Sequence, residues 1–496
     1  MKRARLVCCA LMFPGVAAGQ SQATIDSAVN SITPHDILGR IAVIAADSMR
    51  GRSTPSPGLE LTAAYIADQF RRVGLAPAGD GSGYIQRFSL LRVEARYLLV
   101  KGSDGSVWRA GRHLVQLSGG TVEAVSGSAF VVGGRAVLPV DTDLDGAVVL
   151  VVTDQVSGGP GVKLEAQKLI ANIGERNPVA IIVVSDFPQA VWDSVARRDL
   201  DSELGIERPE GVPVLAVQTG TAKAVLSARG HKLPKDGDLT VQQVDDLEFT
   251  ITVRHQIEEY AAPNVVGVLE GRDPVLKNEY VVFSGHMDHM GVGPPVKGDS
   301  IYNGADDNAS GTIAVVAAAE AFSKLAPRPK RSLIFLTVSA EENGLLGSAY
   351  FADNPVAPMS QIVAALNMDM IGRNRPDEVT VIGKDHSDLG RTLMRVNGRH
   401  PELKLKVADD SRPEERLYFR SDHYNFARRG VPILFFFGGI HDDYHKPSDE
   451  VGKIDADKES RIVKLVFYLG LEIANATERP KWDPASYREI VGGKGR

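Results

Sequence analysis

The sequence predicts an α/β fold in which helices cover both faces of a mostly parallel or mixed β-sheet, with a separate β-rich region inserted before that sheet. From about residue 260, apolar strand-like runs alternate with loops and helical patterns. The runs are apolar along their whole length, as strands are when helices bury both faces of a sheet. At 496 residues the chain is too long for one compact core, so two or three domains are expected.

The second half of the chain supplies the elements of this sheet. Strands are expected at 279–284, 332–338, 362–368 and 431–437, and helices at 311–325 and from 344 onward. Loops that follow the carboxyl ends of parallel strands gather at one edge of a sheet. Residues that are far apart in the sequence are therefore expected to meet at that edge.

The first half of the chain has a different pattern. A helical periodicity over 62–73 ends at Gly74, and residues 20–100 are predicted to form a helical segment that packs on the later domain. From 101 to 255, short β-branched runs are punctuated by glycine and aspartate, with one helical stretch at 163–173. This β-rich region has no His, Asp and Glu cluster like the one found later, so we expect an accessory domain.

The first 19 residues are predicted to be a signal peptide for export to the periplasm or the medium. Three basic residues stand within positions 2–5, a short apolar stretch follows, and positions 17–19 are small residues suited to cleavage. The alternative is a frayed N-terminal helix of a cytosolic protein. Both cysteines, Cys8 and Cys9, lie in this segment, so a cysteine-based zinc site in the mature protein is excluded.

Charge and hydropathy exclude other classes of partner. The formal net charge is −6 and no basic block stands out, so nucleic acid is not an expected partner. No apolar run after the signal peptide is long enough for a membrane span. Nothing in the sequence predicts an oligomeric state.

Five residues of metal-ligand type lie on five separate segments of the second half, and nearly all follow an apolar strand. They are His286, Asp307, Glu342, Asp369 and His445. Two imidazoles and three carboxylates, with a further glutamate beside one of them, match the ligand set of a two-metal hydrolase. Imidazole nitrogen and carboxylate oxygen are suitable ligands for zinc, and they can also bind cobalt or manganese in its place.

The motifs around these residues strongly resemble those of the M28 family of co-catalytic zinc aminopeptidases and carboxypeptidases. In chain order they are His-Met-Asp at 286, Gly-Ala-Asp-Asp-Asn-Ala-Ser-Gly at 304, Glu-Glu-Asn-Gly-Leu-Leu-Gly-Ser at 341, Asn-Met-Asp-Met-Ile-Gly at 367 and Tyr-His-Lys-Pro-Ser-Asp at 444. Each motif alone is weak, but five in this order are specific. The resemblance implies a zinc-exopeptidase-like domain at 256–480, a protease-associated (PA) domain at 101–255 and a C-terminal tail at 481–496.

The resemblance also implies a role for each residue. Asp307 would bridge two Zn²⁺ ions, with His286 and Asp369 completing one metal and Glu342 and His445 completing the other. Glu341 would be the general base, and Tyr444 would donate a hydrogen bond to the oxyanion.

Position in the sequence suggests a supporting residue as well. Asp288 lies two residues beyond His286, where its carboxylate is well placed to accept the imidazole N–H and fix the ring.

Several alternatives remain open from the residues alone. Asp306 competes with Asp307 as the ligand, or it caps the helix that starts near Ala309 together with Asn308. The Glu341–Glu342 pair is otherwise a solvated loop, and Tyr444 otherwise only packs against its own loop. His289 is expected at the surface or behind the ligands, and Asp422 and His423 are left outside the metal set.

The leading functional prediction is an exported aminopeptidase that acts on peptides with a free N-terminus. A carboxypeptidase or another amidohydrolase on the same scaffold is the second prediction. It requires a basic pocket for a substrate carboxylate, and four arginines are candidates: Arg373, Arg375, Arg416 and Arg420. A non-catalytic receptor and a single-zinc cyclase are disfavoured, because every ligand position and the position of the base hold competent residues.

Overall fold

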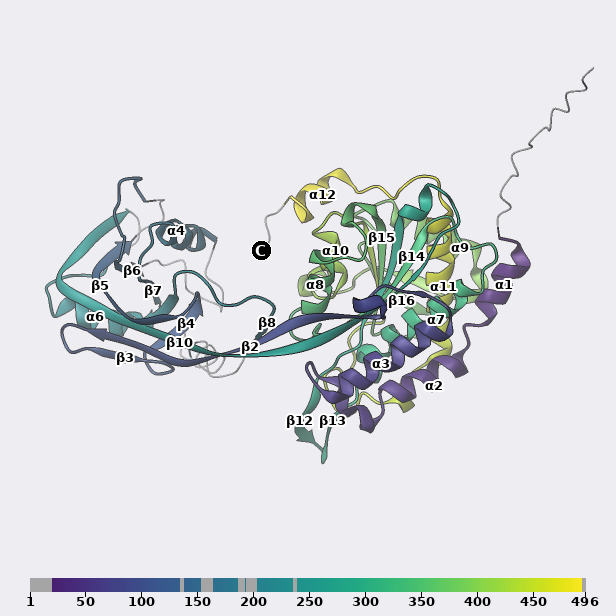
Figure 1. Ribbon diagram of the computed structural model, residues 1–496, viewed down its shortest axis with the longest axis horizontal. Coiled ribbons are helices and arrows are strands. Elements are labelled where there is room, and N and C mark those ends of the chain that lie inside the picture. The colour runs from purple at the N-terminus through teal and green to yellow at the C-terminus, as the bar shows by residue number, and fades with distance from the viewer. Residues whose placement is uncertain are drawn as a thin grey trace, which may run out of the picture. The chain divides into compact units, whose positions relative to one another are not determined.

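The computed structural model describes residues 20–133, 138–152, 164–185, 192, 203–234 and 239–492. The chain divides into two compact units, one formed by the chain up to Phe88 and from Ala261, the other by Ser89–Tyr260 (Figure 1). The sequence places the inserted region at 101–255. The predicted signal peptide, residues 1–19, lies outside the described residues.

The first unit is built on a mixed sheet whose central strands are parallel. Its strands are β10 (Thr240–Leu269), β11 (Tyr280–His286), β14 (Ser332–Val338), β15 (Ile362–Asp369), β16 (Glu378–Ile382), β17 (Lys406–Ala408) and β18 (Ile433–Phe437). Their order is β17-β16-β18-β15-β11-β14-β10. The pairs β18·β15, β15·β11 and β11·β14 are parallel, whereas β14·β10 and β16·β18 are antiparallel. The predicted fold class, a mostly parallel or mixed sheet, is confirmed.

Alternating side chains of these strands enter two separate cores, which explains why the strands are apolar throughout. Val281 and Phe283 of β11 belong to one cluster, and Val282 between them belongs to the other. The first cluster includes residues of the helices α1 (Gln22–Asn30), α2 (Pro34–Ile44), α3 (Pro57–Arg72), α7 (Gly311–Ser323), α9 (Leu389–Arg399) and α11 (Ala456–Asn475). The second includes residues of α8 (Leu346–Asp353), α10 (His423–Ala427) and α12 (Pro484–Ile490), so helices cover both faces (Figure 1).

The three N-terminal helices begin at well-defined caps. The side chains of Ser21, Thr33 and Ser56 accept a backbone N–H in the first turn of α1, α2 and α3. Proline at the start of α2 and α3 costs no hydrogen bond there, because that N–H has no partner within the helix. Gly74 follows α3 with a φ of +76°, the left-handed conformation in which helices commonly end.

The second unit contains a mixed sheet with parallel central strands, and it has helices of its own. Its strands are β2 (Ile85–Gly102), β3 (Val107–Arg109), β4 (Leu114–Ser118), β5 (Val122–Gly133), β6 (Val148–Val152), β7 (Ala180–Ser185), β8 (Glu203–Gly205) and β9 (Val214–Gln218). The order is β10-β5-β6-β7-β9-β4, with β5, β6, β7 and β9 parallel. The helix α6 (Thr219–Ser227) contributes to one core cluster and α4 (Leu164–Gly174) to another. That this unit is a PA domain stays a prediction.

The structure adds elements that the sequence pattern did not predict. The long strands β2 and β10, and a hairpin of β12 (Gly291–Val296) and β13 (Asp299–Tyr302), have no counterpart among the expected elements. The segment expected as a C-terminal tail contains α12, which buries Ile490 in the second core cluster. Among the described residues, no helix combines the length and apolarity needed to cross a membrane.

Candidate metal centre

Four of the five predicted ligands lie at or just beyond the carboxyl ends of adjacent strands. His286 is the last residue of β11 and Asp369 the last of β15. Glu342 lies in the turn after β14, and His445 lies in the loop after β18. Asp307 comes from an irregular turn, Ala305–Ser310, that leads into α7. The sheet order places β18, β15, β11 and β14 side by side, so it brings these ends together.

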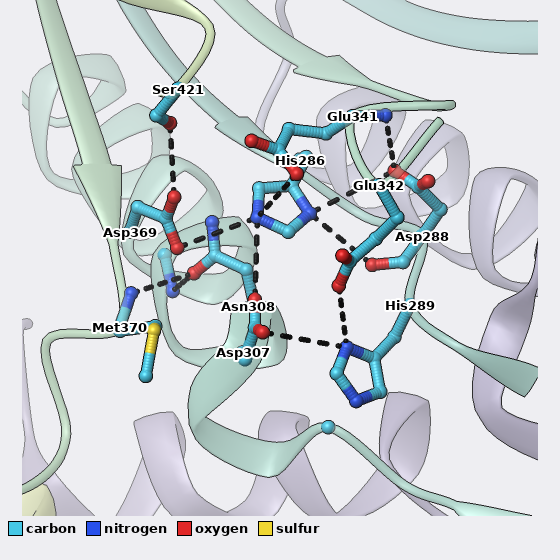
Figure 2. A network of polar contacts seen from close by, with 12 residues as sticks. His286, Asp288, His289, Asp307, Asn308, Glu341, Glu342, Asp369, Met370 and Ser421 are labelled. Carbon is cyan, nitrogen blue, oxygen red and sulfur yellow. Dashed lines mark hydrogen bonds and ion pairs between the residues drawn. The ribbon is translucent and has the colours of Figure 1, made fainter. Parts of the chain in front are cut away.

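The imidazole of His286 lies between two carboxylates. Its Nε2 atom is 3.4 Å from Asp369 Oδ1 and 3.5 Å from Asp307 Oδ1. Figure 2 shows the ring with Asp369 on one side and Asp307 below it. These three residues form one group whose ligand atoms are close enough to share an ion.

The imidazole of His445 makes the corresponding contacts on the other side of Asp307. Its Nε2 atom is 3.2 Å from Asp307 Oδ2 and 3.1 Å from Glu342 Oε2. The two oxygens of Asp307 thus face two different sets of ligands, as a bridging carboxylate requires.

These distances fit zinc. With metal–ligand bonds of about 2.1 Å, the neighbouring ligand atoms of a tetrahedral site lie about 3.4 Å apart. The four nitrogen–oxygen distances of 3.1–3.5 Å cluster around that value. Asp307 Oδ2 and Asp369 Oδ1 are buried and accept no hydrogen bond from any described residue, so their free lone pairs are available to a cation.

The negative charges of the buried carboxylates in this cluster also favour the binding of cations. Burial raises the pKa of Asp307, and the carboxylate of Glu342 raises it further. Burial raises the pKa of Glu341 well above its usual range, with contributions from Asp422 and Asp369. Buried carboxylates that repel one another are costly unless positive charge is bound among them.

The backbone near these ligands adopts unusual conformations. Ala340, Met370 and His445 have φ values of 55°, 53° and 53°, in the left-handed region that residues with a Cβ seldom occupy. Ala340 immediately precedes Glu341, and Met370 immediately follows Asp369. Strain of this kind is tolerated where the surrounding structure holds a functional arrangement in place.

Asp288 supports the centre in a different way from the one expected. Its carboxylate is 3.8 Å from His286 Nδ1, beyond hydrogen-bond distance, and the closer acceptor is its own backbone carbonyl at 3.3 Å. Instead, Asp288 Oδ1 accepts the backbone N–H of Glu341 at 3.2 Å and Oδ2 accepts the hydroxyl of Thr54 at 3.2 Å. Burial raises the pKa of Asp288 to about 6. The residue therefore links the β11 loop to the turn that carries the two glutamates.

The structure separates Asp306 from Asp307. The carboxylate of Asp306 points away from the ligand group, accepts the N–H of Gly372 at 2.6 Å and lies 3.2 Å from His441 Nε2. It does not cap the following helix. Asn308 Oδ1 does accept the N–H of Gly311 at 2.8 Å, near the start of α7.

His289 is buried, with 1% of its surface exposed, so of the two expected positions it occupies the one behind the ligands. Its Nδ1 is 2.9 Å from Glu342 Oε1 in hydrogen-bond geometry but 3.7 Å from Asp307 Oδ2. His289, Asp307 and Glu342 are also close enough to share an ion. The contacts of His445 match ligand spacing more evenly than those of His289, and the shortest contact of His289 is with Glu342.

Sequence reasoning missed several supporting residues. Arg52 is fully buried and donates to four backbone carbonyls, those of Ile44, Met287, Asn303 and Gly304. Burial lowers the pKa of Arg52 to about 10, although nearby carboxylates, Asp288 first, oppose the shift.

Two further side chains, Asp449 and Ser421, make hydrogen bonds that hold the segments carrying the predicted ligands. Asp449 accepts the N–H groups of Asp306 and Asp307, both at 3.0 Å from Oδ2. Ser421 donates to Asp369 Oδ2 at 2.9 Å. Asp449 is the last residue of the motif at 444, so the sequence could have indicated its role. For Ser421 the only indication in the sequence is that Asp422 and His423 follow it.

The five predicted ligands line a cavity of about 40 Å³. Its lining is His286, Asp307, Glu341, Glu342, Asp369, Met370, Leu417, Arg420, Ser421, Phe435, Phe437, Ile440, Tyr444 and His445. The ring of Tyr444 stacks on His445, with centroids 3.8 Å apart. Glu341 and Tyr444 therefore share this cavity with the five ligands.

Comparison with known proteins now adds to this geometry. Residues 264–470 match the model of peptidase family M28. Over these residues the chain is similar to peptidase family M28. The match begins before β11 and includes all five predicted ligands.

Two curated relatives resemble the M28 region. Leupeptin-inactivating enzyme 1 of Streptomyces exfoliatus is 29% identical over 219 residues, 44% of this chain and 44% of the relative. A probable leucine aminopeptidase of Arthroderma benhamiae is 28% identical over 228 residues, 44% of this chain and 60% of the relative. The chain spans about half the length of the curated relatives it matches.

A solved structure resembles nearly the whole chain. The aminopeptidase from Aneurinibacillus sp. strain AM-1 aligns with a TM-score of 0.51 and 17% identity, over 93% of this chain and 98% of that one. At this level of identity the likeness shows a shared fold.

Proposed function

We propose that this protein is a two-zinc aminopeptidase that hydrolyses the N-terminal peptide bond of its substrate. The observation that carries the proposal is the pair of ligand groups on either side of Asp307, with nitrogen–oxygen distances of 3.1–3.5 Å. His286 and Asp369 would hold one ion, Glu342 and His445 the other. When bound, two zinc ions would supply a Lewis acid for the carbonyl oxygen and lower the pKa of a water molecule.

Glu341 is proposed as the general base. Its side chain lines the cavity, and its Oε2 lies 3.9 Å from His286 Nε2, next to the ligand group. Burial keeps its pKa well above the usual range, so it accepts a proton more readily than an ordinary carboxylate. Glu341 would take the proton of the attacking water and pass it to the leaving amine.

Tyr444 is proposed to stabilise the oxygen of the tetrahedral intermediate. The stacking of its ring on His445 holds the side chain at the cavity wall. Burial, then the charge of Asp307 and other carboxylates, raises the pKa of Tyr444, so the hydroxyl keeps its proton as a donor.

The acidic end of the cavity favours an amine rather than a carboxylate close to the scissile bond. Four carboxylates line it: Asp307, Glu341, Glu342 and Asp369. A protonated α-amine is attracted to this group.

The proposal is tested by release of a chromophore from aminoacyl anilides. Activity is expected from the zinc-loaded protein, loss of activity with a chelator, and recovery when zinc is added. Cobalt or manganese is also expected to restore activity, because imidazole and carboxylate ligands accept these ions as well as zinc. Failure of the protein with two zinc ions per chain to cleave any aminoacyl or peptide substrate would overturn the assignment.

We also propose that the protein is exported after removal of residues 1–19. The support is the basic head, apolar stretch and small residues at the N-terminus. Fractionation of the producing cells, with N-terminal sequencing of the protein, tests this. A cytosolic protein that still carries residue 2 would contradict it.

A further inference from the structure

Four arginines were candidates for a carboxylate-binding pocket, and the structure separates them. Arg373 pairs with Asp443 at 2.9 Å, Arg375 lies exposed beside Asp377 at 3.4 Å, and Arg416 sits over the ring of Phe419, 4.8 Å from its centroid. Arg420 alone of the four lines the cavity that the metal ligands share. Its position is not explained by the water-activating chemistry proposed above.

Arg420 is attached closely to the metal centre. It immediately precedes Ser421, whose hydroxyl donates to Asp369 Oδ2 at 2.9 Å. The segment from Leu417 to Ser421 thus contributes three residues to the cavity wall. Arg420 therefore lines the same cavity as the predicted zinc ligands.

The guanidinium of Arg420 has N–H donors that its contact with Glu415 does not use. Its contact with Glu415 is long, at 3.4 Å, and Glu415 lies closer to Arg412, at 2.9 Å. A guanidinium carries five N–H donors, and the side chain of Arg420 is 46% exposed. Most of its hydrogen-bonding capacity is therefore available to a bound molecule.

Among the described residues of the cavity lining, the only carboxylates are those of the proposed metal centre, so none of them is reserved for the charge of Arg420. Two zinc ions would offset the four carboxylates at the metal centre, and the other neighbours of Arg420 in the lining include Leu417, Phe435, Phe437 and Ile440. A guanidinium at the edge of such a lining can bind a carboxylate in a defined, bidentate orientation.

We propose that Arg420 binds a carboxylate of the substrate, and that this contact sets substrate preference. The inference rests on the peptidase function proposed above. Two substrate groups carry this chemistry: the side chain of an N-terminal glutamate or aspartate, and the terminal carboxylate of a dipeptide.

The test compares matched substrates on the full-length, zinc-loaded enzyme. Glutamyl anilide against glutaminyl anilide reports the side-chain source, and alanyl-alanine against its C-terminal amide reports the terminal source. We expect the carboxylate form of at least one pair to be preferred in kcat/KM. For that pair, Arg420→Gln is expected to reduce the preference about 10- to 100-fold, mainly through KM.

Three further variants separate this role from a structural one. Arg420→Lys is expected to keep part of the preference, because the charge remains but the bidentate geometry is lost. Glu415→Gln is expected to strengthen the preference, because it removes a competing carboxylate. Arg416→Gln, in the same loop but outside the cavity lining, is the matched control and is expected to leave the preference unchanged.

The outcomes distinguish the inference from the function on which it rests. If the wild-type enzyme cleaves leucyl anilide but shows no preference within either pair, the role of Arg420 is wrong and the peptidase function stands. If Arg420→Gln and Arg416→Gln alter the preference equally, the effect belongs to the loop and the inference also fails. If no aminoacyl or peptide substrate is cleaved, the proposed function itself has failed.

Discussion

At the scale of single residues, Glu341 and Glu342 are neighbours with different surroundings. Glu342 is held by His289 and His445, whose hydrogen bonds outweigh the effect of burial and lower its pKa, whereas burial raises the pKa of Glu341. We predict that Glu341→Gln lowers kcat about 10²- to 10⁴-fold while zinc content stays near two per chain. Glu342→Gln is expected to lose zinc. Steady-state kinetics with metal analysis checks both, and the reverse pattern would mean that the two roles are exchanged.

Arg52 is a residue whose effect should be on folding rather than on turnover alone. It satisfies the carbonyls of Ile44, Met287, Asn303 and Gly304 and is fully buried. Arg52→Met is predicted to lower the free energy of unfolding by about 3–5 kcal/mol, because those acceptors lose their donor and nearby buried carboxylates lose a compensating charge. Urea denaturation measures this. The exposed Arg50, changed to Met, is the matched control, and equal effects would contradict the prediction.

At the scale of elements, the loop between β18 and α11 carries Tyr444 and His445, and Asp443 anchors it. Asp443 accepts from Arg373 at 2.9 Å and from Ser448 and Lys453 at 2.7 Å. Although burial opposes them, the hydrogen bonds from Lys453, Ser448 and Arg373 depress the pKa of Asp443. A depressed pKa means that this anchor is complete at neutral pH, above the ordinary pKa of an aspartate. It weakens only as pH falls toward the lowered pKa.

We predict that Asp443→Asn weakens zinc binding about 10- to 100-fold at the site that includes His445. The physical reason is that the loop loses its charged anchor while every ligand remains. Zinc titration against a competing chelator measures the affinity. Asp442→Asn, which changes an exposed neighbour, should leave it unaltered, and a loss of affinity in that variant alone would refute the role of Asp443.

The elements that the sequence predicted are those with a local signal. The strand β14 was expected at its observed bounds, 332–338, because its apolar run is continuous and ends in polar residues. The strand β10 was not expected, because polar residues such as Gln242, Asp245 and Asp246 interrupt its apolar pattern. Its pairing with β5 and β14 stabilises it, and neither partner is adjacent in sequence.

The residues of the candidate site also divide into those with a local sequence signal and those without one. That the five candidate ligands come close together could be predicted, because each follows a strand or lies in a quoted motif. Arg52 could not, because an arginine between glycine and serine reads as a solvated loop, and three of its four acceptors lie more than 200 residues away. His289 likewise contacts a residue distant in sequence, Glu342, 53 residues further on.

At the scale of the whole molecule, the two units have separate cores, and only one contains the proposed metal centre. The ligands all lie in the unit that ends at Phe88 and resumes at Ala261, whereas Ser89–Tyr260 has hydrophobic clusters of its own. Ligand binding stabilises the folded form that binds it. Metal removal should therefore act on one unit and spare the other.

We predict that chelation lowers the melting temperature of the metal-binding unit by about 10 °C, since zinc at about 1,000 times its dissociation constant contributes about 4 kcal/mol. The melting temperature of the Ser89–Tyr260 unit should stay the same. Scanning calorimetry of residues 20–496, with chelator and after zinc is restored, measures both transitions. His286→Ala serves as the control, because it should bind less zinc and respond less to the chelator. Equal shifts of both transitions on chelation would show that the metals stabilise the chain as a whole, against the independence of the two cores.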